Sequence, residues 1–552
     1  MKARIEDGIV YSPYPYIPLT KDGTLYGFLM EALTAHGSKT ALICGQDKVT
    51  YINLRDKLRC CASGFRRQGI GKGDRVYVHF GNSIENFVAL CSIPLTGASL
   101  VTSDIMWRED DIGDKIERSG ATHVLTDASH AEMFARIITS SNIKKAFLVG
   151  EKRPGFNSVS EIIENEELLP HESEFETGGC TFVKWTTGTT GAPKGAEYSE
   201  ERLLRHIVGL ASGELFSSND IWLGDCAICY LTMVYLWLAA LHRGCTIVVS
   251  KTCHAVPLDV FDVIKDCEAV TIITISSRIR RILDFMKTTK DWDKVLRRTL
   301  RRIVLVASTP PPGLAEELIN TFQLAELRNI YGMTEAGGCM TLPPKGELSC
   351  ENVGFPIAGA RMKIIDTESN KVLGPMQCGE VLFDTPCAAI RYCGHDEAEA
   401  TITDEQGWIH TGDLGYYDHD GRLFLCGRLK TMMVCQRRKV SPVNIEHCLI
   451  EHPAVEEAAV VGVSAPDGDQ FPAAVVVAKR GHNRDQQLAD ELKRHVAERN
   501  NSSMHLHGGV YFIDALPKNT LGKARSALIL ELVGMLRRMD SADETVCGDL
   551  IY

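Results

Sequence analysis

The chain has 552 residues, of which 24% are charged and 44% hydrophobic, and its formal net charge is −11. This length exceeds what one hydrophobic core usually supports, so we expect several domains. The acidic balance, without any Lys/Arg-rich block, argues against a nucleic-acid partner.

The 19 cysteines are scattered, and residues 1–7 lack the apolar core of a secretion signal, so we expect reduced thiols in the interior. The most apolar run, residues 226–241, is shorter than a membrane span requires, and we expect a buried helix there. The final residues, 549–552, do not read Ser-Lys-Leu, the peroxisomal signal, so we expect a cytoplasmic protein without a transmembrane segment.

Helical and strand patterns alternate through the first half of the chain. Helices are predicted at residues 25–34, 54–68 and 82–94, and strands at 40–44, 75–79, 98–102, 123–126 and 145–149. Further strands are predicted at 246–249, 269–274 and 302–306. This alternation predicts parallel sheets in layered α/β domains.

The pattern changes after about residue 350. Strands at 361–365 and 379–383, with a hairpin at 416–425, predict a smaller antiparallel or barrel-like unit. From residue 441 the chain predicts a compact α+β module: Ser441 and Pro442 begin a helix, strands follow at 457–462 and 473–478, and a helix at 486–499.

The strongest motif is Thr-Thr-Gly-Thr-Thr-Gly-Ala-Pro-Lys-Gly at residues 186–195. Its glycines allow backbone N–H groups to approach phosphate oxygens, while its hydroxyls and Lys194 add donors and charge. A strand at 182–185 leads into it. A P-loop of the kinase or GTPase type is excluded, because that pattern needs Gly-Lys followed by Ser or Thr.

The motif resembles the phosphate-binding loop of the adenylate-forming superfamily, which includes acyl-CoA synthetases, adenylation domains of peptide synthetases and luciferases. Further segments resemble that family's signatures in its order: 331–335 (Tyr-Gly-Met-Thr-Glu), 379–380 (Gly-Glu), 408–413 (Trp-Ile-His-Thr-Gly-Asp), 427–430 (Gly-Arg-Leu-Lys) and 517–523 (Pro-Lys-Asn-Thr-Leu-Gly-Lys). The resemblance covers nearly the whole chain. It is strongest to 4-coumarate–CoA ligase-like and luciferase-like members.

The resemblance implies an α/β fold. Its N-terminal domain, residues 1–427, has two parallel-sheet subdomains and a β-barrel-like subdomain, and binds ATP and the acid. A hinge at 428–432 follows, and a small mobile α+β domain, 433–552, carries the catalytic lysine, Lys523. That domain rotates about the hinge, which moves Lys523 into and out of the cleft.

The resemblance also implies roles for individual residues. The residues implied in nucleotide binding are Thr186, Thr187, Gly188, Thr189, Thr190, Gly191, Lys194, Asn329, Tyr331, Gly332, Thr334, Asp413, Arg428 and Lys523. Those implied in catalysis are Lys523, Thr334, Glu335 and Lys194, and those near Mg²⁺ are Glu335 and Thr187. The expected reaction activates a fatty or aromatic carboxylic acid with ATP and Mg²⁺, because joining two anions requires such positive charge.

The acid pocket is expected at Tyr230, Met233, Thr309, Ile330 and Gly332. Transfer of the acyl group to CoA should follow, giving acyl-CoA, AMP and pyrophosphate. The chain departs from the family pattern at two positions that concern this step: Tyr230 stands at the gate of the thiol tunnel, and Arg437 replaces a glycine that lines it. Arg437, Arg438 and Lys439 could bind the 3′-phosphate of CoA, or form a solvated basic loop.

Two other functions remain open from the sequence. One is an adenylating oxygenase of the luciferase type. The other is a ligase-derived binding protein with weak thioester formation.

Overall fold

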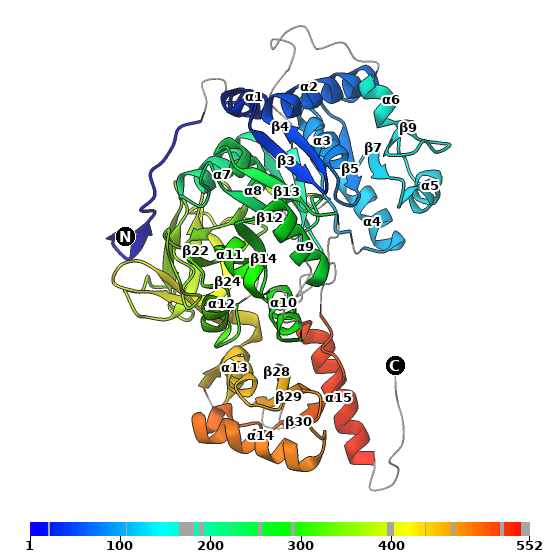
Figure 1. Ribbon diagram of the computed structural model, residues 1–552. Helices are drawn as coiled ribbons and strands as arrows, with labels where there is room; N and C mark the ends of the chain where they lie inside the picture. The colour runs from blue at the N-terminus through cyan, green and yellow to red at the C-terminus, as the bar shows by residue number, and fades with distance from the viewer. Residues whose placement is uncertain are drawn as a thin grey trace.

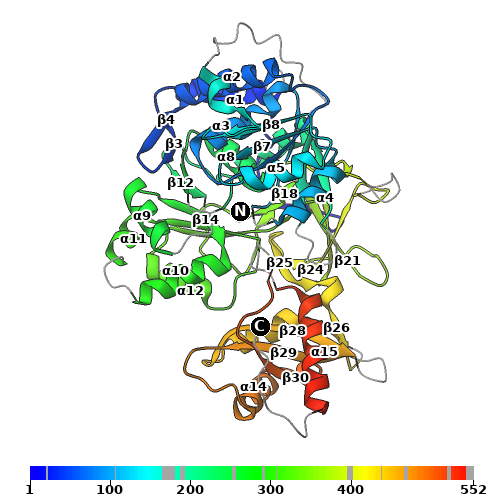
Figure 2. The same cartoon turned by 90° about the vertical axis from the view of Figure 1, so that its right-hand side faces the viewer.

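The computed structural model describes residues 1–19, 23–105, 107–164, 181–186, 193–224, 226–251, 257–288, 293–307, 309–394, 402–436, 438–464, 470–518 and 524–542. Three large sheets and their helices form most of the larger part of the molecule (Figure 1). A smaller C-terminal module lies below this part, and Figure 2 shows the same arrangement after a quarter turn.

Two of the sheets are mainly parallel, as expected for layered α/β units. The eight strands described in the first sheet run in the order β23 (Arg391–Tyr392), β11 (Gly195–Ser199), β10 (Thr181–Trp185), β6 (Ser99–Val101), β5 (Arg75–His79), β7 (His123–Asp127), β8 (Lys145–Val149) and β9 (Asn157–Ser158). The seven described in the second run β16 (Glu326–Ile330), β15 (Arg302–Val306), β14 (Thr271–Ile275), β12 (Ile221–Gly224), β13 (Thr246–Val249), β3 (Thr40–Cys44) and β4 (Asp47–Thr50).

Each of these sheets takes strands from distant parts of the chain. The early strand β3 pairs with β13, so that Leu42 lies opposite Ile247. Conversely, the late strand β23 extends the first sheet by pairing with β11, which sets Tyr392 opposite Ala196. One continuous core joins these sheets, and the two α/β units are therefore interleaved along the sequence.

The third unit was expected to be antiparallel or barrel-like. It is antiparallel, but within the described residues it does not form a closed barrel. Its described strands form an open antiparallel sheet in the order β1 (Arg4–Glu6), β2 (Ile9–Tyr11), β21 (Arg361–Ile365), β22 (Gly379–Asp384), β24 (Ile409–Tyr417) and β25 (Leu423–Arg428). The N-terminal hairpin supplies one edge of the sheet, where Val10 lies opposite Met362. The two edge strands, β1 and β25, are not paired with each other, so the sheet is open.

Helices cover the two parallel sheets. They are α1 (Leu25–His36), α2 (Tyr51–Arg67), α3 (Ile84–Ser92), α4 (Glu109–Ser119), α5 (Ala131–Thr139), α6 (Val159–Glu164), α7 (Glu200–Ser212), α8 (Leu231–His242), α9 (Pro257–Cys267), α10 (Ser276–Thr288), α11 (Asp293–Thr299) and α12 (Leu314–Phe322). Side chains cap several of them: Thr24 accepts a hydrogen bond from the Gly27 N–H, and Thr50 one from the Asn53 N–H.

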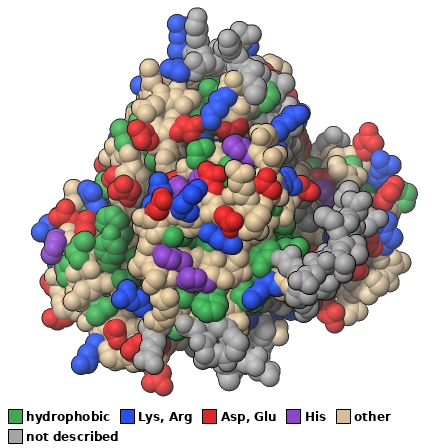
Figure 3. All heavy atoms as spheres, turned by 90° about the horizontal axis from the view of Figure 1, so that it is seen from below, with side chains coloured by type: hydrophobic (Ala, Val, Ile, Leu, Met, Phe, Trp, Pro, Cys, Tyr) green, Lys and Arg blue, Asp and Glu red, His purple; other side chains and the backbone are tan. Residues whose placement is uncertain are grey.

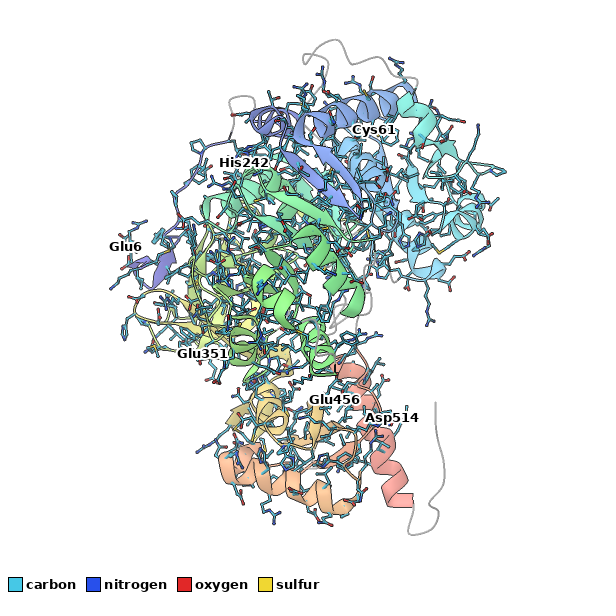
Figure 4. The ribbon with its side chains drawn as sticks, viewed as in Figure 1. Glu6, Cys61, His242, Glu351, Glu456 and Asp514 are labelled. Atoms are coloured by element: carbon cyan, nitrogen blue, oxygen red, sulfur yellow. The ribbon has the colours of Figure 1, made fainter. Side chains whose placement is uncertain are left out.

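The apolar run 226–241 forms a helix only from Leu231, later than predicted. The Asn82 amide explains the delay, because it donates to the carbonyl of Cys226 at 3.1 Å and accepts from the Ile228 N–H at 2.8 Å. These bonds satisfy the backbone in a non-helical form. The helix ends at His242, labelled in Figure 4, whose ring stacks on Phe28 at 4.4 Å.

The C-terminal module has its own hydrophobic cores. It contains the hairpin of β26 (Met433–Cys435) and β27 (Arg438–Val440), the sheet of β28 (Val455–Ser464), β29 (Gln470–Ala478) and β30 (Gly509–Phe512), and the helices α13 (Pro442–Ile450), α14 (Gln486–Arg499) and α15 (Ser526–Ala542). The buried residues of these cores all belong to the module. Figure 4 labels two of its surface carboxylates, Glu456 and Asp514.

No helix in the described ranges is long and apolar enough to cross a membrane. No disulfide joins any of the cysteines within the described ranges. On the face seen from below, Lys and Arg side chains are interspersed with Asp and Glu among the coloured residues (Figure 3).

Candidate active site

The Gly/Thr-rich motif joins two antiparallel strands of the first sheet. Trp185 at the end of β10 lies opposite Gly195 at the start of β11. The Thr186 N–H donates to the Lys194 carbonyl at 2.8 Å, and the Lys194 N–H donates to Thr186 Oγ1 at 2.9 Å. The two ends of the motif are therefore fixed to each other. Thr187, Gly188, Thr189, Thr190 and Gly191 lie outside the described residues.

Lys194 and Glu335 meet through a residue that sequence reasoning missed, Tyr392. The Lys194 ammonium lies 4.8 Å from the centre of the Tyr392 ring. The Tyr392 hydroxyl donates to Glu335 Oε1 at 2.9 Å. Burial, together with the Glu335 charge, raises the pKa of Tyr392, which keeps its hydroxyl protonated as a donor.

The segment that carries Thr334 and Glu335 is held by its backbone. The Tyr198 hydroxyl donates to the Thr334 carbonyl, and the Ala389 N–H donates to the Glu335 carbonyl at 2.8 Å. Gly332 pairs with Cys339, and a Cβ at Gly332 would lie 1.9 Å from the Gly338 carbonyl oxygen. Only glycine fits there, so the geometry requires the glycine of this motif.

Tyr331, Asp413 and Arg428 form a second cluster, from three separate predicted motifs. The Tyr331 hydroxyl donates to Asp413 Oδ2 at 2.6 Å, and Arg428 forms an ion pair with the same carboxylate, with 2.8 Å between its Nε and Asp413 Oδ1. Asp413 is buried and lies opposite Arg428 in the pairing of β24 with β25. Burial and the Asp413 charge raise the pKa of Tyr331. A carboxylate has further acceptor capacity, so Asp413 could also bind two hydroxyls of a ligand.

The predicted acid-pocket residues differ in their exposure. Ile330 and Met233 are buried, at 3% and 2%, whereas Thr309 and Gly332 are exposed. Met233 packs against the sheet, since a Cβ on Gly224 would lie 2.8 Å from its Cε. Tyr230 occupies the N-cap position of α8, and its side chain makes no capping hydrogen bond there. Asn329 is buried in the last part of β16.

A polar cluster that sequence reasoning did not find lies between β10 and α8. Lys184 Nζ donates to Thr232 Oγ1 at 2.6 Å and to the Tyr235 hydroxyl at 3.3 Å. His206 of α7 packs edge-on against Tyr235, with ring centres 4.5 Å apart. Burial lowers the pKa of Lys184 to about 8 and that of His206 to about 3. The sequence signal was a lysine inside an otherwise apolar strand, two residues before the motif.

Several predicted residues cannot be placed. Lys523 and Arg437 lie outside the described residues, as does the side chain of Lys439. Arg438 is described, in β27, and it is exposed. The isolated bridge between Lys518 and Ala524 brackets the segment that carries Lys523.

The junction between the larger part and the module is close-packed. After β25 the chain makes a 3₁₀ turn, Leu429–Thr431, before β26. Ser441 Oγ donates to the Cys426 carbonyl at 3.0 Å. A Cβ on Gly427 would lie 2.7 Å from Ser441 Oγ. Gly427 has φ +143°, which favours glycine.

Comparisons with known proteins identify the family and the fold. The model of the AMP-binding enzyme family matches residues 29–393, and that of the AMP-binding enzyme C-terminal domain matches residues 444–523. Among curated relatives, 4-coumarate–CoA ligase 3 of Oryza sativa subsp. japonica is 27% identical over 542 residues, covering 94% of each chain. The 4-coumarate–CoA ligase of Pinus taeda is 27% identical over 536 residues, covering 93% of this chain and 95% of its own.

Solved structures share the fold. The anthranilate CoA ligase AuaEII in complex with anthranoyl-AMP superposes with a TM-score of 0.83 at 19% identity, covering 95% of this chain and 99% of that one. ATP-bound MatB from Rhodopseudomonas palustris gives 0.82 at 21% identity, covering 92% and 98%.

Proposed function

Because the chain belongs to the family of AMP-binding enzymes, we propose that it activates a carboxylic acid with ATP and then transfers the acyl group to CoA. In the first step a carboxylate oxygen bonds to the α-phosphorus of ATP, and pyrophosphate leaves. In the second step the CoA thiol attacks the acyl carbon, and AMP leaves. The 4-coumarate–CoA ligases among its relatives support an AMP-forming acid–thiol ligase.

This proposal depends mainly on two contacts that share Tyr392: the Lys194 ammonium lies over its ring, and its hydroxyl donates to Glu335. It places a cation and a carboxylate on either side of one phenol, next to the end of the Gly/Thr-rich motif. This arrangement suits triphosphate and a metal ion, because the cation attracts phosphate oxygens and the carboxylate attracts the metal.

Glu335 fits an Mg²⁺ ion. Within the described residues its Oε1 accepts from Tyr392, while its Oε2 accepts no hydrogen bond. No cluster of three metal-binding side chains occurs in the part of the chain that the structure describes. Mg²⁺ is commonly held by one or two carboxylates with substrate phosphates, so Glu335 would share it with ATP, with Thr187 as a further candidate. When bound, the ion offsets the negative charge of the phosphates.

The Asp413 cluster supports nucleotide binding at a second point. We propose that Asp413 accepts hydrogen bonds from both ribose hydroxyls, while Arg428 and Tyr331 orient its carboxylate. The Tyr331 ring would lie against the adenine. Burial of Asp413 strengthens such bonds, because water competes less for the carboxylate.

Lys523 is proposed to bridge the incoming carboxylate and the α-phosphate. It would reach them by rotation of the module, residues 433–552, about a hinge at 428–432, which is a conformational gating step. The separate cores of the module support movement as a unit. Arg437, Arg438 and Lys439 are proposed to contact CoA.

The first test is acid-dependent exchange of pyrophosphate into ATP across a panel of aliphatic and aromatic acids. We expect exchange with at least one acid, and a loss of about 100-fold or more in Lys523→Ala, because one preorganised donor contributes about 3 kcal/mol to such a step. Lys518→Ala is the matched control, since this lysine lies on the same segment and pairs with Glu457. Equal losses in both variants would contradict the role of Lys523.

The second test is CoA-dependent release of AMP with the best acid. Exchange without any effect of CoA would contradict the thioester step. Light emission or oxygen uptake with luciferin would instead indicate an adenylating oxygenase. No exchange with any acid would indicate a binding protein derived from a ligase.

A further inference from the structure

Lys184 is a cation with neutral partners. Its ammonium donates to Thr232 Oγ1 at 2.6 Å and to the Tyr235 hydroxyl at 3.3 Å, and lies 5.8 Å from the Tyr235 ring centre. Thr232 and Tyr235 are one turn apart on α8 and so share a face of that helix. An ammonium has three donor hydrogens, and these two hydroxyls use two of them.

No carboxylate of the described chain forms an ion pair with Lys184. Burial lowers the pKa of Lys184, and Cys339 and then Glu335, neither of which hydrogen-bonds to it, partly oppose that effect. Withdrawing an ammonium from water is costly unless an anion or strong acceptor compensates it. Among the described residues Lys184, which is partly buried, has these two hydroxyl acceptors, and one donor hydrogen is left for an oxygen of a ligand.

A second polar group lies beside Lys184 without a partner. His206 is 1% exposed, and neither of its ring nitrogens has a hydrogen bond within the described residues. Its ring contacts Tyr235 edge-on. Burial and the Lys184 charge keep the imidazole neutral, so it can offer one donor and one acceptor.

The position of the cluster links it to the acid. Lys184 lies on β10, two residues before Thr186, and its contacts are on α8, the helix expected to line the acid pocket. The acid's reacting carboxylate is proposed to meet Lys523 and the α-phosphate. Because that carboxylate is already assigned to other partners, the acceptor for Lys184 would be a second oxygen at the opposite end of the acid.

We propose that Lys184 is a specificity-determining residue that binds an oxygen acceptor at the end of the acid remote from its reacting carboxylate. This inference rests on the proposed adenylation, and it names the substrate class: an acid with a distal hydroxyl or carboxylate, such as a hydroxyaryl acid or a dicarboxylic acid. An unsubstituted fatty acid would place a methyl end against the ammonium and leave it uncompensated.

The test uses two matched pairs of acids: 3-(4-hydroxyphenyl)propanoic with 3-phenylpropanoic acid, and suberic with octanoic acid. In at least one pair the wild-type chain should use the oxygen-bearing member with a kcat/KM at least 10-fold higher in pyrophosphate exchange. In Lys184→Met this preference should fall to within about 2-fold through a higher KM for the oxygen-bearing acid. The KM for ATP should be unchanged.

Two controls separate specificity from structure. Lys48→Met changes an exposed lysine of β4 and should keep the preference, and Lys184→Arg should keep part of it. Equal losses for both members of each pair in Lys184→Met would overturn the inference, because Lys184 would then serve the reacting carboxylate, ATP or the fold.

Calorimetric binding of the same acids, without ATP, tests the inference independently of turnover. Equal affinity of the wild-type chain for both members of both pairs would also overturn it. Failure of all exchange with a retained binding preference would contradict the proposed adenylation alone.

Discussion

Tyr392 donates a 2.9 Å hydrogen bond to Glu335, although 57 residues separate them along the chain. The pairing of β23 with β11 brings the tyrosine to this position, because it sets Tyr392 opposite Ala196, close to Lys194 in the Gly/Thr-rich motif. The same ring lies under the Lys194 ammonium. One phenol thus positions both the proposed metal ligand and the proposed phosphate-binding cation.

Tyr392→Phe should lower the apparent affinity of the enzyme for Mg²⁺, because it removes the hydroxyl that donates to Glu335 but keeps the ring under Lys194. A hydrogen bond to a charged group contributes about 1.5–3 kcal/mol, so we expect the half-saturating Mg²⁺ concentration in pyrophosphate exchange to rise about 10-fold. Tyr416→Phe, which changes a ring stacked on Phe424, is the control. An unchanged Mg²⁺ response in Tyr392→Phe would show that Glu335 does not need this hydroxyl.

Asp413→Asn and Tyr331→Phe should raise the KM for ATP by different amounts. The asparagine removes the charge that Arg428 and the proposed ribose hydroxyls share, and we expect an increase of about 30-fold or more. The phenylalanine removes one hydroxyl that orients the carboxylate, and an increase of about 5-fold is expected. Steady-state kinetics at saturating acid give both values, and the reverse order would contradict the assigned geometry.

Gly427→Ala should loosen the junction between the module and the larger part. Its Cβ would lie 2.7 Å from Ser441 Oγ, at a backbone position with φ +143°. We expect a loss of stability of about 1–3 kcal/mol from strain and displacement, seen as a lower unfolding temperature and faster proteolysis near the junction.

The Gly427→Ala/Ser441→Ala double variant separates the two causes. It removes the close contact but keeps the backbone strain, so part of the lost stability should return relative to the sum of the single variants. Ser441→Ala alone should cost about 1 kcal/mol, because it removes one hydrogen bond to Cys426. Additive effects would contradict a direct clash.

Glu446 should make the stability of the module depend on pH. Burial raises the pKa of this carboxyl from 4.5 to about 7, and its Oε1 accepts from the Val460 N–H at 2.9 Å. A raised pKa means that the folded module favours the protonated form. The resulting stability is complete below about pH 4.5 and is lost as the pH rises through about 7.

Glu446→Gln should therefore stabilise the module at pH 8 by up to about 3 kcal/mol and have little effect at pH 5. Glutamine retains an acceptor for the Val460 N–H and carries no charge. Calorimetric unfolding of the full chain at the two pH values measures the difference, with the exposed Glu451→Gln as control. An equal effect of Glu446→Gln at both pH values would contradict the raised pKa.

The linear sequence was enough to identify the family. Its motifs are contiguous, and the chemistry of a Gly/Thr-rich loop or a Tyr-Gly-Met-Thr-Glu segment follows from neighbouring residues. The parallel α/β units and the α+β module also followed from local periodicity. The sequence could not show that β1 and β2 complete an open sheet instead of a barrel, because strand partners are set by contacts across hundreds of residues.

Tertiary structure alone decided how the candidate site is supported. Tyr392, Tyr198 and Lys184 belong to none of the motifs, and each reaches its partner through strand pairing or packing between distant elements. The charge of Lys184 is visible in the sequence. The neutrality of its surroundings is not, because that depends on which side chains the folded chain brings within hydrogen-bonding distance.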